Sequence, residues 1–131
     1  MTPTLPQQEP DAAGQPLRAY TDPAYRPLCD TLAQVRANID RLDEDIVRCL
    51  AERAMYVKDA ARFKADAHQV SAPARQAEVF ARVQALAARH DPGFDHFDDV
   101  VQATYRSMVA AFIAHEQTYF TQMKPVGDNH D

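Results

Sequence analysis

Hydrophobic positions recur every three or four residues in a long segment, from Leu28 to Ala72, that contains neither glycine nor proline. These positions are Leu32, Val35, Ile39, Leu42, Ile46, Cys49, Leu50, Val57 and either Ala60 or Ala61. Such spacing places them on one face of an α-helix. Because Asp30 is a suitable N-cap, the pattern predicts a helix from Thr31 to about Ala67, roughly 50 Å long.

The same periodicity predicts two shorter helices. Pro73 is tolerated at a first helical position and opens a helix that is expected to end near His90. Its apolar stripe is Val79, Val83 and Leu86. After the Asp91-Pro92-Gly93 break, a third helix is expected from about Asp95 to just before Lys124. Its apolar face holds Val101, Tyr105, Met108, Phe112 and Tyr119. No segment alternates like a strand, so the predicted fold is an all-α, three-helix chain with one long N-terminal helix.

The two ends of the chain differ in composition from its middle. Residues 1–27 hold six of the nine prolines, and proline at this density opposes both helices and sheets. We therefore expect a flexible proline-rich arm over residues 1–27, a helical domain over residues 28–123 and a mobile tail over residues 124–131. A length of 131 residues allows one domain.

The length of the first helix has an architectural consequence. Two shorter helices from the same chain cannot cover its whole apolar stripe, and an uncovered stripe is unfavourable in water. We expect a second copy to cover it, with the long helices antiparallel. The sequence thus predicts an intertwined homodimeric helical bundle.

Composition narrows the class of protein. A net charge of −5 argues against nucleic acid as a partner, since backbone binding needs a basic face. The two cysteines, Cys29 and Cys49, lack a metal-like spacing. No apolar run is long enough to span a membrane, and residues 1–10 show no secretory pattern, so we expect a cytoplasmic protein. An acidic cluster with two histidines near residue 95 is interpreted as helix caps and dipole partners, and no metal or cofactor is expected.

Charged residues interrupt the apolar stripes. Stepping along the first helix from Leu50 leads to Arg53, Val57, Ala60 and Lys64, and Arg36 lies beside the start of that stripe. Arg75 shares a face with the second stripe, although the helix dipole disfavours cations in a first turn. Glu116 follows Met108 and Phe112 in steps of four. Each cation alone is commonly a snorkelling surface residue, with its stem on apolar surface and its head in water. Together they suggest a shared anionic ligand, and arginine forks suit carboxylates.

Five segments, in order and at matching spacing, resemble the all-helical chorismate mutase family, which includes the related isochorismate pyruvate lyases. They are residues Leu32 to Asp43, Leu50 to Arg53, Val57 to Lys64, Ala72 to Arg75 and Tyr105 to Gln117. The resemblance implies a homodimer with two sites that bind a small dicarboxylate. Each site would take Arg53, Lys64, Arg75 and Glu116 from one chain and Arg36 from the other. In this family Gln76 stands where a glutamate often binds a substrate hydroxyl.

The resemblance brings two candidate reactions, neither of which needs a cofactor. Chorismate mutases rearrange chorismate to prephenate for aromatic amino-acid biosynthesis, and the lyases split isochorismate into salicylate and pyruvate. In both reactions Lys64 would stabilise negative charge on the ether oxygen, and Glu116 would need to be protonated to donate a second hydrogen bond there. We expect the mutase reaction, with Arg53, Lys64 and Glu116 as the catalytic residues.

Two alternatives to the mutase stay open. The segment Tyr56 to Ala65 looks close to the lyases, whereas these commonly carry glutamine at the position of Glu116. A non-catalytic helical dimerisation module would also have long capped helices. Such a module would have no reason to turn Arg53, Lys64 and Arg75 inward.

Overall fold

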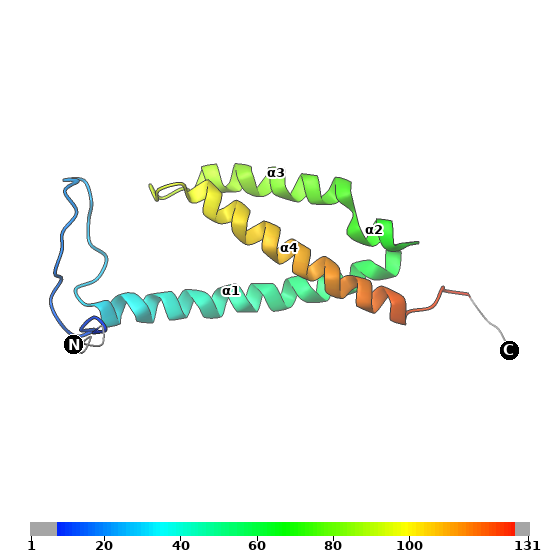
Figure 1. The fold of residues 1–131 in the computed structure, drawn as a ribbon, viewed down its shortest axis with the longest axis horizontal. Helices are drawn as coiled ribbons and strands as arrows, with labels where there is room; N and C mark the ends of the chain where they lie inside the picture. The colour runs from blue at the N-terminus through cyan, green and yellow to red at the C-terminus, as the bar shows by residue number, and fades with distance from the viewer. Residues whose placement is uncertain (1–7, 128–131) are drawn as a thin grey trace, which may run out of the picture. The chain divides into compact units, whose positions relative to one another are not determined.

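The fold is all-helical in the computed structural model, which describes residues 8–127 (Figure 1). The elements in chain order are α1 (Leu32–Ala60), a 3-10 turn η1 (Ala61–Phe63), α2 (Ala67–Ser71), α3 (Pro73–His90) and α4 (Phe97–Gln122). Three of them are long, and residues 8–127 contain no strand, which confirms the predicted fold class. None of the helices in this range has the length and apolarity that crossing a membrane requires. The chain divides into two compact units, Met1–Leu50 and Ala51–Asp131.

In the first unit, a capping box opens helix α1. The Thr31 hydroxyl accepts a hydrogen bond from the Gln34 backbone N–H at 3.3 Å, and the Gln34 side-chain oxygen accepts from the Thr31 N–H at 3.2 Å. The N-cap is thus Thr31 and not Asp30, because Gln34 stands three residues after Thr31 and completes the reciprocal pair.

Residues 8–31 before this helix form turns and bends only. The Ala33 N–H donates to the Ala12 carbonyl at 2.9 Å, and the rings of Tyr20 and Tyr25 lie 4.5 Å apart. The flexibility expected of residues 1–27 and 124–131 stays a prediction. Residues 1–7 and 128–131 lie outside the described range.

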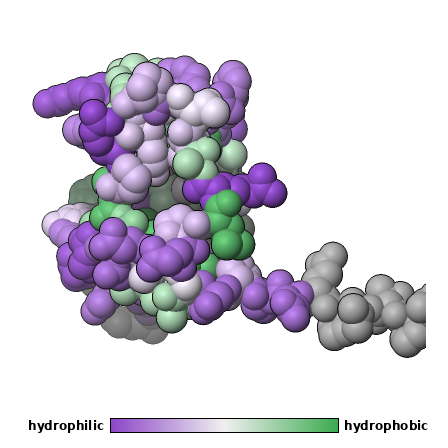
Figure 2. All heavy atoms as spheres, turned by 90° about the vertical axis from the view of Figure 1, so that its left-hand side faces the viewer, coloured by the Kyte–Doolittle hydropathy of each residue, from purple (hydrophilic) through white to green (hydrophobic). Residues whose placement is uncertain are grey.

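The N-terminal half of α1 exposes its apolar stripe. Val35, Ile39, Leu42 and Ile46 are between 38% and 56% exposed, and no residue of α1 is fully buried. On the face drawn in Figure 2, hydrophilic residues predominate and hydrophobic residues form separate patches. The stripe therefore exists as the sequence indicates, and the unit Met1–Leu50 does not itself bury it.

The core of the second unit lies around α4, which packs against α3, α2 and η1. Its buried apolar residues are Ala61, Val70, Val83, Ala87 and Val109. Val79 and Leu86 of α3 are half-buried beside them, so the predicted stripe of this helix is confirmed. Near the start of α4, the Gln102 amide donates to the Phe80 carbonyl of α3 at 2.9 Å.

The prediction that the first helix runs to about Ala67 was wrong. Helix α1 ends at Ala60, one 3-10 turn follows, and Lys64 has an extended backbone with φ −109° and ψ 140°. The Asp66 side chain then accepts from the Gln69 N–H at 2.9 Å and starts the separate helix α2. An aspartate in this role favours a new N-terminus over a continued helix. Lys64 therefore lies on a linker and not on the face of α1.

Candidate active site

The five residues of this unit that were predicted to act in a site line one pocket. They are Arg53, Lys64, Arg75, Gln76 and Glu116, from α1, the linker, α3 and α4. The pocket holds about 120 Å³, and its other walls are mainly apolar. These walls are formed by Val70, Ser71, Ala72, Val79, Val109, Phe112 and Ile113. Three cations and one carboxylate thus line one recess, together with these mainly apolar residues.

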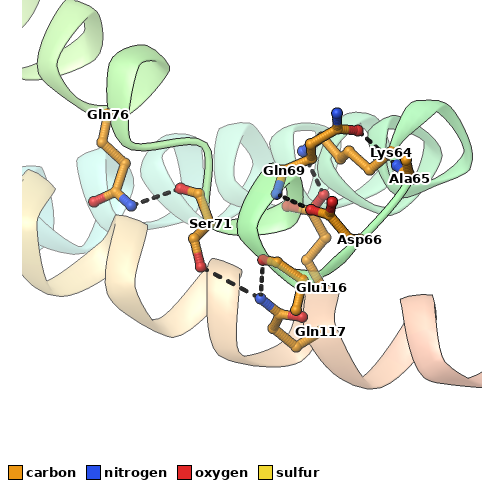
Figure 3. A network of polar contacts seen from close by, with 9 residues as sticks. Lys64, Ala65, Asp66, Gln69, Ser71, Gln76, Glu116 and Gln117 are labelled. Carbon is orange, nitrogen blue, oxygen red and sulfur yellow. Dashed lines mark hydrogen bonds and ion pairs between the residues drawn. The ribbon is translucent and has the colours of Figure 1, made fainter.

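An ion pair between Lys64 and Glu116 lies in this pocket. The Lys64 Nζ donates to Glu116 Oε2 at 2.6 Å, across 52 residues of sequence (Figure 3). The Glu116 side chain is only 5% exposed and that of Lys64 20%. Water screens such a pair poorly, and removing one partner leaves a charge buried without its counter-charge.

The local fold explains why these two groups meet. On α4, Glu116 follows Val109, Phe112 and Ile113 in the pocket wall, so the packing of this face buries the carboxylate. Because the backbone leaves the helical path at η1, Lys64 lies on an extended linker, from which it lines the same pocket. The position of Lys64 therefore depends on where helix α1 ends. It does not follow from the helical periodicity by which the sequence placed this residue.

The two arginines of the pocket are held less tightly. The half-buried Arg53 guanidinium lies over the Phe112 ring, 5.0 Å from its centroid, which fixes its position through a cation–π contact. Arg75 pairs with Glu78 at 3.3 Å, and both side chains are more than 60% exposed. Since exposed pairs of this kind contribute little stability, Arg75 can exchange Glu78 for a carboxylate ligand.

Gln76 contributes a neutral polar group to the pocket. Its Nε2 donates to the Ser71 carbonyl at 2.6 Å. This bond uses the amide N–H and leaves the amide oxygen as the group with which Gln76 can accept a hydrogen bond. The side chain can therefore bind a ligand hydroxyl, which is the role that its sequence position suggests.

Two further sequence predictions concern Arg36 and the acidic cluster near residue 95. Arg36 belongs to the unit Met1–Leu50, and its role in a site stays a prediction. At the start of α4, ligand atoms of His96, Asp98 and Asp99 lie within 4.8 Å of one another, and all three residues are exposed. Asp98 and Asp99 occupy the first turn of α4, where the helix dipole favours acidic side chains.

Sequence reasoning missed the contribution of Gln117. The phase of α4 separates it from Glu116, and its Nε2 instead donates to the Ala67 carbonyl at 2.9 Å and the Ser71 hydroxyl at 3.4 Å (Figure 3). Both acceptors belong to α2, a helix that was not predicted. The available signal was Asp66 followed three residues later by Gln69, a spacing typical of helix N-termini.

Comparison with known proteins relates this geometry to a family. The family described as chorismate mutase type II matches residues 35–117 of the chain. The chain is also similar to an isochorismate pyruvate lyase from Pseudomonas aeruginosa, with 34% identity over 96 residues. The similar region covers 73% of this chain and 91% of that relative. All five pocket residues named above lie within the range that the family matches.

The energetic role of the ion pair can be measured with a double-mutant cycle. We expect Lys64→Met and Glu116→Gln to show a coupling of about 2 kcal/mol in urea unfolding at pH 7, because Lys64→Met alone leaves the buried carboxylate unpaired. Arg62→Met with Asp59→Asn is the control, since that pair has a 2.8 Å contact but exposed side chains. A coupling no larger than that of the control would contradict a buried, mutually dependent pair.

Proposed function

Because the chain belongs to the chorismate mutase type II family, we propose that it is a chorismate mutase, which rearranges chorismate to prephenate in aromatic amino-acid biosynthesis. The observation that carries the proposal is the buried Lys64–Glu116 pair in a pocket with two further cations. The free cysteines Cys29 and Cys49 favour a reducing compartment, and we propose the cytoplasm.

Substrate binding follows from the charges of the pocket. Arg53 and Arg75 present guanidinium forks that suit the two carboxylates of chorismate, and the apolar walls fit its ring. Gln76 would accept a hydrogen bond from a substrate hydroxyl. Holding a flexible dianion in its folded, reactive shape lowers the barrier without any nucleophile.

The chemical step would use the ion pair in a rearranged form. As the carbon–oxygen bond of the enolpyruvyl ether breaks, negative charge grows on the ether oxygen, and the Lys64 ammonium stabilises it. In the unliganded pocket this ammonium donates to Glu116. If the Glu116 carboxyl takes up a proton when the dianion binds, it releases Lys64 and donates a second hydrogen bond to the same oxygen.

A second candidate is the isochorismate pyruvate lyase reaction, which the similarity to the Pseudomonas aeruginosa lyase favours. It also breaks the carbon–oxygen bond of an enolpyruvyl ether, so Lys64 would serve both reactions. A purely structural dimerisation module is a weaker candidate. Burying the Glu116 carboxylate is unfavourable for folding, and such a module has no function that requires it.

We also propose that the functional unit is a homodimer. The exposed stripe of Val35, Ile39, Leu42 and Ile46 is continuous along one side of α1, and a second copy of the same helix is a complementary partner for it. Arg36 of the partner subunit would then complete each site, as the family resemblance implies.

A direct assay tests the reaction. Incubated separately with chorismate and isochorismate, the protein is expected to form prephenate from the first, and Lys64→Ala to lower this rate at least about a hundredfold by removing the cation at the ether oxygen. Lys58→Ala is the matched control, because Lys58 lies over the Tyr119 ring and does not line the pocket. Salicylate and pyruvate as the main products would favour the second candidate, and no product from either substrate would exclude both.

Subunit mixing tests the shared site. Arg36→Ala and Lys64→Ala should each be inactive, whereas dimers re-formed from an equal mixture should regain about a quarter of wild-type activity. Half of the dimers would be mixed, and each mixed dimer would carry one intact site of two. Activity that stays at the level of the single variants, in a mixture shown to have exchanged subunits, would mean that Arg36 does not act across the interface.

A further inference from the structure

Helix α2 forms one wall of the pocket although it is too short to be stable alone. It spans five residues, Ala67–Ser71, and isolated helices of fewer than about 12 residues are marginal in water. Yet Val70, Ser71 and the following Ala72 all line the pocket, and the preceding linker carries Lys64. The shape of the site therefore depends on contacts that other segments make with α2.

One set of contacts fixes the beginning of α2. The Asp66 side chain accepts from the Gln69 N–H at 2.9 Å, and the Gln69 side-chain oxygen accepts from the Ala65 N–H at 2.6 Å. Val70, which is 1% exposed, packs below this turn. These local bonds define the turn of α2 but do not themselves attach it to α4.

Polar attachment to α4 comes from Gln117. Its amide donates to the carbonyl of Ala67, the first residue of α2, and lies 3.4 Å from the hydroxyl of Ser71, the last (Figure 3). The carbonyl of Ser71 in turn accepts from Gln76 of α3 at 2.6 Å. A single α4 side chain thus holds both ends of α2, one residue after Glu116.

We propose that Gln117 is a positioning residue, which holds α2 in the conformation that the ligand requires and so sets the apparent affinity for substrate. This inference rests on the proposed function, because it concerns the same pocket. If α2 is formed in only a fraction of the molecules, the apparent dissociation constant of the ligand equals the intrinsic constant divided by that fraction. The bound complex, in which α2 is formed, reacts at the same rate.

The chain contains a matched comparison for this bond. Gln102, also on α4 and also half-buried, donates its amide to the Phe80 carbonyl at the same distance of 2.9 Å, but it does not line or border the pocket. Loss of either bond removes one link between α4 and a neighbouring helix. Of the two side chains, only Gln117 bonds to a residue that lines the pocket, Ser71, so a general loosening of α4 can be separated from an effect on the site.

The experiment compares Gln117→Met with Gln102→Met, since methionine keeps the length of the side chain and removes the donor. We expect Gln117→Met to raise KM by about threefold to tenfold, because losing one hydrogen bond lowers the fraction of molecules in which α2 is formed. The value of kcat should stay within about twofold of the wild type. Gln102→Met should leave both constants unchanged. Equal KM values for Gln117→Met and wild type, equal rises in both variants, or a fall in kcat without a rise in KM would each overturn the proposal.

A second measurement does not depend on turnover. Amide hydrogen exchange of Gln69, Val70 and Ala72 should become faster in Gln117→Met and stay as in the wild type in Gln102→Met. If the wild type converts neither substrate, the proposed function fails while this comparison still decides whether Gln117 holds α2. Faster exchange with an unchanged KM would instead leave the proposed function intact and refute the link to affinity.

Discussion

The contact between Lys64 and Glu116 constrains the rest of the pocket-bearing unit. A carboxylate buried to this degree on α4 needs a cation close by, and Lys64 lies beside it after the chain has left the helical path at Ala60. After this interruption of the helix, Asp66 caps a new helix, α2, which is too short to be stable without contacts to other segments. Much of the local architecture between α1 and α3 therefore serves to place one ammonium group beside one carboxyl group.

The proposed chemistry depends on the same contact. Both candidate reactions create negative charge at an ether oxygen, and a desolvated ammonium is suited to stabilise it. Arg53, held over Phe112, and Arg75, weakly held by Glu78, differ in how firmly they are placed. This difference suits a site in which one cation is preorganised and another closes onto an arriving carboxylate. The exposed stripe of α1 adds a further requirement, since a site shared with a second copy would couple activity to assembly.

Sequence reasoning succeeded where side chains follow helical periodicity and failed where the chain departs from it. The stripe of α3 and the phase of Glu116 on α4 follow from steps of three and four, and so does the position of Arg53. Lys64 was selected for the wrong reason, because its place was derived from a helix that in fact ends at Ala60. A helix of five residues has no detectable period, so α2 could be found only through its capping residues. The bonds of Gln117 end on α2, so they could not be predicted while α2 itself was missing from the prediction.

Replacing Glu116 tests the central role of the Lys64–Glu116 pair most directly. Glutamine keeps the length of the side chain and can donate a hydrogen bond, so Glu116→Gln should keep kcat/KM for chorismate within about tenfold of the wild type, whereas Glu116→Leu, which cannot donate, should lower it at least about a hundredfold. Equal losses in the two variants would contradict the account.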